Sequence, residues 1–152
     1  MIKKLILIIS LLAFASATDI NINKSISKAK KQDKHILIFV HTPYCGYCKR
    51  MKKTTLNADI VTAKIKKDFI FVDIDVSQDG IVYFNDFKGS KKEFKNFLGL
   101  EYYPSTFFVN KEGEDIYDQA GYQDRDTFLN ILNFVSKEAY EEIGIEDFKD
   151  EN

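Results

Sequence analysis

Two largely apolar runs divide the chain, and each predicts a strand buried between two layers. The first run is Ile36–Val40 and the second is Phe69–Asp75, and both are rich in the β-branched and aromatic residues that strands favour. Runs of this kind are typical of parallel strands that helices cover on each side. A shorter apolar segment, Ile81–Phe84, predicts an edge strand.

Apolar residues recur at helical spacing around these strands. They predict helices in the segments 22–29, 58–67, 90–98 and 126–137. Ser90 and Glu93 have the spacing of a capping box and indicate where the third of these helices begins, and Gly99 is a plausible stop for it. A further helix is expected from Cys45 onward, because Pro43 ends the strand before it.

The order of these elements indicates the fold class. Thr106–Val109 and Asp115–Tyr117 flank the turn residues Asn110–Gly113 and predict a hairpin. Helices between strands imply parallel pairing, and the hairpin adds antiparallel pairing. We therefore expect an α/β fold with a mixed central β-sheet and helices on both faces.

The first 17 residues have the three-part pattern of a secretory signal. Lys3 and Lys4 form a positive start, a largely apolar run of ten residues follows at 5–14, and Ala15–Ala17 offers small residues to a signal peptidase. The apolar run is too short for a membrane-spanning helix, which needs about 20 residues. We expect export to the periplasm or another exported location after cleavage near Ala17, where disulfides persist.

Length and charge narrow the remaining possibilities. The chain has 152 residues with 22 basic and 23 acidic side chains. We expect one domain at 18–137 and an acidic tail at 138–152, which holds seven acids and one lysine and forms a frayed helix or a solvated end. The balanced charge offers no basic stripe, so we expect no nucleic-acid partner, and we expect a monomer.

The two cysteines of the chain, Cys45 and Cys48, lie at the predicted helix start after the first buried strand. Unpaired N–H groups at a helix start favour a thiolate over a thiol. Such a position can lower the pKa of a cysteine from about 8.5 to about 3.5–7.5. Cys45 is therefore the candidate nucleophile, and Cys48, one turn later, can attack a mixed disulfide on Cys45.

Two other uses of the cysteine pair stay open. A zinc site would need two further ligands, and the only histidines, His35 and His41, are about 20 Å apart along an extended strand. An inert disulfide is possible in an exported protein, although a bridge across so short a loop stabilises a fold little. We expect no metal and no cofactor other than the disulfide of Cys45 and Cys48 itself.

The sequence resembles the thioredoxin superfamily, and within it the exported thioredoxin-related proteins. The features that carry the resemblance are His35–Val40, Cys45-Gly46-Tyr47-Cys48, Phe69–Asp75, Tyr103-Pro104-Ser105-Thr106 and Gly121. Together they cover about residues 22–137, and the resemblance implies a thioredoxin-like fold.

The resemblance also implies a substrate groove beside the cysteines. It implies a cis proline that faces the disulfide, and Pro104 matches that position, so the backbone of Tyr103 would pair with an extended substrate. The groove residues expected are Tyr44, Gly46, Tyr47, Tyr103, Pro104 and Gly121. The tyrosines among them, together with Tyr122, form either an apolar platform for a substrate protein or a chance gathering in a tyrosine-rich chain.

Two positions depart from the thioredoxin pattern. The family carries a buried acid six residues before the first cysteine and a lysine in the following strand, and these positions are Phe39 and Phe71 here. The usual proton acceptor for Cys48 is therefore missing. His41 lies nearby in sequence and is a candidate proton relay, with a merely packed or surface histidine as the alternative.

These observations favour an exported thiol–disulfide oxidoreductase that reduces protein disulfides through Cys45 and Cys48. A membrane-bound electron donor is the expected partner, and protein disulfides or dithiols are the expected substrates. A dithiol oxidase is the first alternative, because nothing in the sequence sets the reduction potential. The second is a non-catalytic binding module whose disulfide is structural.

Overall fold

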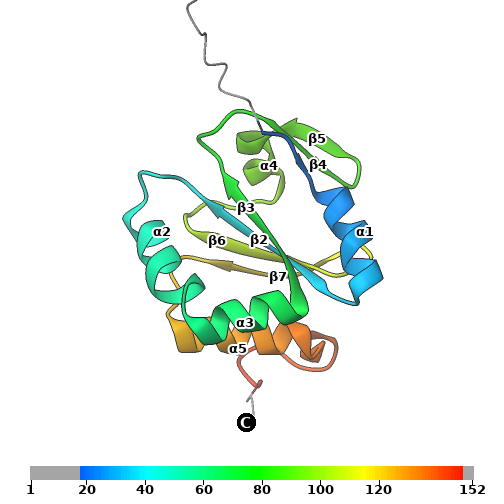
Figure 1. Ribbon diagram of the computed structural model, residues 1–152, viewed down its shortest axis with the longest axis vertical. Coiled ribbons are helices and arrows are strands. Elements are labelled where there is room, and N and C mark those ends of the chain that lie inside the picture. Colours follow the sequence, from blue (N-terminus) through cyan, green and yellow to red (C-terminus); the bar gives the residue numbers. More distant parts are fainter. Residues whose placement is uncertain (1–17, 149–152) are drawn as a thin grey trace, which may run out of the picture.

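The centre of the molecule is a four-stranded mixed sheet (Figure 1). The structure is a computed structural model that describes residues 18–148, so the expected secretory signal at 1–17 lies outside the described residues. The strands of this main sheet are β3 (Phe69–Asp75), β2 (His35–His41), β6 (Ser105–Val109) and β7 (Asp115–Ala120), in that order. The β2–β3 pair is parallel, and β6 is antiparallel to both of its neighbours, which confirms the mixed sheet and the hairpin.

A second sheet has three strands, in the order β1–β4–β5. They are β1 (Ile20–Asn21), β4 (Ile81–Phe84) and β5 (Phe87–Ser90). The strand predicted at 81–84 is therefore confirmed, but its predicted position at an edge is wrong, because β4 lies in the middle. Its neighbours escaped prediction since β1 has two residues and β5 follows a two-residue turn, in which Asn85 takes a φ of 50° that asparagine tolerates.

Within residues 18–148 there are five α-helices, and each matches a helix that the sequence predicts. They are α1 (Ile22–Gln32), α2 (Gly46–Met51), α3 (Asp59–Asp68), α4 (Lys91–Phe97) and α5 (Arg125–Ser136). A capping box joins Ser90 and Glu93 at the start of α4, as the spacing predicts. The helical segment that begins with α2 continues as a π-helix, η1 (Lys52–Leu56), which nothing in the sequence indicated.

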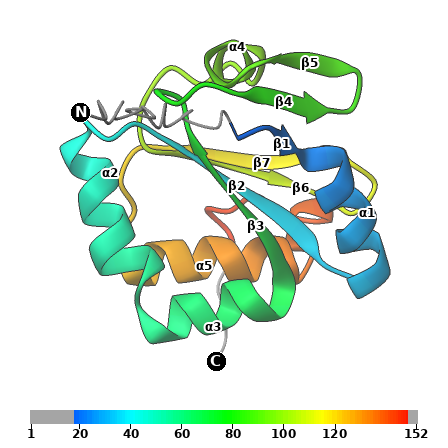
Figure 2. The same ribbon diagram turned by 45° about the horizontal axis from the view of Figure 1, so that its top comes forward.

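Helices cover both faces of the main sheet (Figure 2). On one face, α1, α4 and the second sheet enclose a first core that includes Ile38 and Phe94. On the other face, α3 and α5 enclose a second core that includes Phe39 and Phe128. Since successive residues of a strand point to opposite faces, β2 contributes to both cores, and all seven of its residues are buried.

Strand β3 is less buried than its apolar sequence predicts. It is one of the two edge strands of the main sheet, and Phe71 is 41% exposed. Asp73 is exposed as well. The two strands look alike in the sequence but differ in the structure. Strand β2 is buried at the centre of the fold, whereas β3 lies at an edge and keeps polar side chains such as Asp73 exposed.

The segment after α5 differs from the frayed helix or solvated end that the acidic composition predicts. A 3-10 turn, η2 (Ala139–Glu141), follows α5. The rings of Tyr140 and Phe148 lie 6.4 Å and 5.5 Å from the ring of Phe134, so this segment packs on the second core. Apolar residues spaced between the acids make this possible. In the described range 18–148, no helix is both long enough and apolar enough to cross a membrane.

Phe108 tests the assignment of the second core. Its ring is fully buried and lies 5.8 Å from the ring of Phe69 and 6.1 Å from that of Tyr117. We expect Phe108→Ala to lower the free energy of unfolding by about 3–5 kcal/mol, because it leaves a cavity. The exposed Ile60→Ala should cost about 0.5 kcal/mol or less. Urea unfolding followed by circular dichroism measures both, and similar losses would contradict this core.

Candidate active site

Several strands end or begin at the edge of the main sheet where the cysteine pair lies. Val40, near the end of β2, pairs with Ser105 at the start of β6, and Ser105 pairs with Ala120 at the end of β7. The residues next to these strand ends are Pro104 and Gly121. The register of the sheet therefore brings both of them to the edge from which the cysteine loop departs.

Cys45 and Cys48 are joined by a disulfide at the start of α2, with their Cα atoms 5.2 Å apart. Cys45 is the N-cap residue of the helix. Its Sγ accepts a hydrogen bond from the backbone N–H of Cys48 at 3.0 Å. A helix start leaves such N–H groups without carbonyl partners, so this donor can stabilise negative charge on the Cys45 sulfur when the disulfide opens.

The two cysteines differ in their access to solvent. Cys45 is partly exposed, whereas Cys48 is 2% exposed. A sulfur of another protein can therefore approach Cys45 but not Cys48. This asymmetry suits a nucleophile and a resolving thiol, respectively.

Tyrosines surround the exposed face of α2. Tyr44 is 90% exposed and Tyr47 is 63% exposed. The ring of Tyr47 lies 6.3 Å from that of Tyr122, and the guanidinium of Arg50 lies 4.6 Å from the centre of the Tyr122 ring. Tyr47, Arg50 and Tyr122 thus form a partly exposed aromatic patch beside the disulfide. Gly46, between the cysteines, has open space where a side chain would stand.

The loop before β6 leads into the main sheet at the same edge. The Tyr103–Pro104 peptide bond is cis, and the carbonyl of Pro104 accepts a hydrogen bond from the N–H of Gly121 at 2.7 Å. Gly121 has a φ of +87°, which favours glycine.

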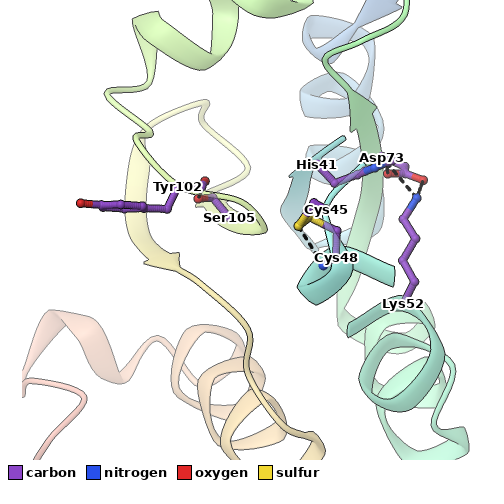
Figure 3. The surroundings of a disulfide bond; sticks show 7 residues. All are labelled: His41, Cys45, Cys48, Lys52, Asp73, Tyr102 and Ser105. Carbon is purple, nitrogen blue, oxygen red and sulfur yellow. Dashed lines mark hydrogen bonds and ion pairs between the residues drawn. A yellow bond between two sulfur atoms is a disulfide. The ribbon is translucent and has the colours of Figure 1, made fainter. Parts of the chain in front are cut away.

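The side chain of Tyr103 packs against the first core, where burial raises the pKa of its phenol. It therefore does not join the ring contacts that link Tyr47 to Tyr122, and the predicted four-tyrosine platform is not formed as a unit. Sequence reasoning missed the neighbouring Tyr102, which is 65% exposed and points away from the disulfide (Figure 3).

A cluster of three polar side chains lies on the other side of the disulfide in the view of Figure 3. It consists of His41, Lys52 and Asp73. The Nε2 atom of His41 lies 2.7 Å from Oδ1 of Asp73 and 2.8 Å from Nζ of Lys52. The ammonium of Lys52 donates to Oδ2 of Asp73 at 2.9 Å. The His41 side chain is 9% exposed, so the candidate relay is a buried, paired histidine.

The local sequence explains why these three groups meet. His41 ends β2, and Asp73 lies on the neighbouring strand, where it pairs with Phe39. Residues 39, 41 and 73 therefore share one face of the sheet. Lys52 follows Cys48 by four residues, which places both on one side of the helix. Helical spacing could have singled out Lys52, but only the strand register identifies Asp73 as its partner.

Two forces act on Asp73 in opposite directions. Partial burial raises the pKa of its carboxyl group, while the hydrogen bonds from His41 and Lys52 lower it. The hydrogen bonds prevail, and the pKa of Asp73 lies below its ordinary value. Asp73 is thus held as an anion beside two groups that can carry protons.

This edge of the sheet holds histidine, cysteine and aspartate, which are residue types that bind metal ions. Across residues 18–148, no group of three or more histidine, cysteine or acidic side chains is placed to hold a metal ion. At His41 and Asp73, the neighbouring group is the ammonium of Lys52, which is a donor and not a metal ligand.

Comparisons with known proteins agree with this geometry. A family model described as a thioredoxin-like domain matches residues 22–136. A thioredoxin-fold protein from Helicobacter pylori is 27% identical with a TM-score of 0.62, over 78% of this chain and 75% of that chain. No curated protein matches the sequence.

Two more distant solved structures share the fold alone. A disulphide isomerase from Xylella fastidiosa is 23% identical with a TM-score of 0.54, over 78% of this chain and 88% of that one. A thioredoxin from Thermus thermophilus is 18% identical with a TM-score of 0.60, over 79% of this chain and 88% of that one.

The lowered pKa of Asp73 makes folding stability depend on pH. The stabilisation is fully present above the pKa of Asp73 in the unfolded chain, about 3.9. It is lost as the pH falls through the lower pKa that Asp73 has in the folded protein. Because the side chain is 44% exposed, we expect a contribution under about 1 kcal/mol.

We expect Asp73→Asn to be less stable than the wild type at pH 6 and about equal to it at pH 2.5, as measured by urea unfolding. Asp79→Asn, at an exposed position outside the cluster, serves as the control. A stability difference between wild type and Asp73→Asn that stays the same at both pH values would contradict the assignment of this ion pair.

Proposed function

The chain belongs to the family of thioredoxin-like domains, and on that premise we propose that it is a thiol–disulfide oxidoreductase working through Cys45 and Cys48. The observation that carries the proposal is the place of the Cys45 sulfur. Cys45 caps α2, its sulfur accepts an N–H hydrogen bond and the residue is partly exposed, while Cys48 is buried. A purely structural disulfide needs none of these features.

In the proposed reaction, the Cys45 thiolate attacks one sulfur of a substrate disulfide. A bond forms between Cys45 and that sulfur, and the other substrate sulfur leaves as a thiolate. Cys48 then attacks the Cys45 sulfur, which forms the Cys45–Cys48 disulfide and releases the second substrate sulfur. Two electrons pass from the protein dithiol to the substrate, and the protein ends in the oxidised state that the structure shows.

We propose that the substrate is a protein segment in extended conformation. The wall formed by Pro104 and Gly121 lies at the same sheet edge as the cysteines and leaves the backbone of Tyr103 as a place for strand pairing. The exposed rings of Tyr44 and Tyr47 supply apolar surface next to the reactive sulfur. This arrangement suits a partner that offers main-chain hydrogen bonds more than a small thiol.

The direction and the place of the reaction are part of the proposal. The pattern of residues 1–17 supports export, and an exported reductase needs a membrane-bound donor, because such compartments are kept oxidising. An oxidase would use the same residues in the reverse order. The two differ in reduction potential, for which about 30 mV corresponds to 1.4 kcal/mol.

A trapping experiment tests the function. We expect reduced Cys48→Ser to hold substrate proteins on Cys45 as mixed disulfides, because the resolving sulfur is gone. Cys45→Ser is the matched control and should capture almost nothing, since Cys48 is buried. Non-reducing electrophoresis and mass spectrometry of extracts with blocked thiols measure the capture.

Because the variant is added in its reduced form, capture reports attack by Cys45 on substrate disulfides, which is the direction of a reductase. Equal capture by the two variants would contradict the assigned roles. An empty trap with Cys48→Ser would leave the enzymatic account without support and favour a binding module with a structural disulfide.

A further inference from the structure

The contacts among His41, Lys52 and Asp73 cannot all be ordinary hydrogen bonds at once. The Nε2 atom of His41 either carries a proton or accepts one. With a proton, it donates to Asp73 at 2.7 Å but faces the Lys52 ammonium at 2.8 Å. Without a proton, it accepts from Lys52 but faces the carboxylate. The cluster therefore has two proton arrangements. In each of them, His41 makes a hydrogen bond to one neighbour and an unfavourable contact with the other.

The two neighbours of the His41 nitrogen carry opposite charges. An adjacent carboxylate favours the charged form of an imidazole, and an adjacent ammonium favours its neutral form. Here the carboxylate oxygen of Asp73 and the ammonium nitrogen of Lys52 both lie within 3 Å of Nε2 of His41.

The cluster lies where the buried thiol of Cys48 would need a base. Cys48 is 2% exposed, so its proton has little direct access to bulk water. Lys52 lies one helical turn beyond Cys48 on the same side, and its ammonium reaches His41. In the view of Figure 3, the His41 side chain extends from the region of the disulfide toward Asp73, and Asp73 and Lys52 lie on its side away from the disulfide. Phe39 is fully buried and stacks on the His41 ring at 5.3 Å, which holds the ring in place.

A polar pocket connects the cluster to solvent. The pocket has a volume of about 220 Å³ and is lined by His41, Lys52, Asp73, Asp75, Gln78 and Lys91. The charged groups that face the histidine are thus Asp73 and Asp75 from β3, Lys52 from η1 and Lys91 from α4. Asp75 already accepts hydrogen bonds from the N–H and hydroxyl groups of Ser77, at 2.9 Å and 2.7 Å. A proton taken up by His41 can leave through this pocket.

Building on the proposed function, we propose that His41 accepts the proton of the Cys48 thiol as Cys48 attacks the mixed disulfide, and that Lys52 and Asp73 are positioning residues. In this step the S–H bond of Cys48 breaks and its proton moves to the imidazole. The Cys48 sulfur bonds to the Cys45 sulfur, and the bond from Cys45 to the substrate sulfur breaks. The substrate sulfur leaves with the electron pair, and His41 later releases the proton through the pocket.

A coloured aromatic disulfide, 5,5′-dithiobis(2-nitrobenzoate), separates this step from the first attack. Reduced protein releases one coloured thiolate when Cys45 attacks and a second when Cys48 resolves the mixed disulfide. We expect His41→Gln to slow the second release about tenfold or more at pH 7, because glutamine keeps a donor toward Asp73 but cannot take up a proton. The rate of the first release should change less than threefold.

The positioning residues are tested by the pH dependence of the second release. We expect Asp73→Asn to move the midpoint to lower pH and Lys52→Met to move it to higher pH, by about one unit each, because the removed charges have opposite signs. Lys53→Met removes an exposed lysine from the same π-helical segment and should not move it. A purely structural role would not produce shifts of opposite sign.

The outcomes separate this inference from the function on which it rests. A wild-type protein that releases the first thiolate and never the second would overturn the oxidoreductase itself. If the wild type releases the second thiolate normally and His41→Gln releases it as fast as Lys53→Met does, only the proposed role of the cluster is overturned. Shifts of the same sign in Asp73→Asn and Lys52→Met would also overturn it.

Discussion

A sulfur atom takes the place of the usual oxygen at the start of helix α2. The first N–H groups of a helix have no carbonyl partners, and one of them here donates to the sulfur of Cys45 at 3.0 Å. The rest of the molecule keeps that helix start in place. Strand β2 runs through the centre of both cores and ends at His41, four residues before Cys45. The fully buried β2 therefore supplies the rigid support from which the reactive sulfur projects.

The same arrangement gives the two cysteines unequal environments. Cys45 has a backbone donor and access to solvent, so it suits attack on another protein. Cys48 is buried, so its reactivity depends on where its proton can go. In the pattern that the sequence resembles, an acid stands at the position of Phe39. Here Phe39 is apolar. The titratable side chains on the same face of the sheet are His41, two residues further along β2, and Asp73, which pairs with Phe39 on β3.

Much of this could be predicted from the sequence, because local patterns control it. Apolar runs identified β2 and β3, the capping box identified the start of α4, and the spacing of the cysteines identified the reactive pair. What escaped prediction depends on contacts between distant segments. Strand β1 forms only because β4 lies beside it, and Lys52 meets Asp73 across 21 residues of sequence. The apolar residues of the acidic tail, such as Phe148, needed the surface of α5 before their role could be recognised.

The central claim is that the position of the Cys45 sulfur stabilises its thiolate. The most direct test is a titration of the reduced protein, in which the absorbance of the thiolate at about 240 nm is followed against pH, with Cys45→Ser to assign the signal. The account predicts that Cys45 ionises with a midpoint below about 7.5. A midpoint near the ordinary cysteine value of about 8.5 would contradict it.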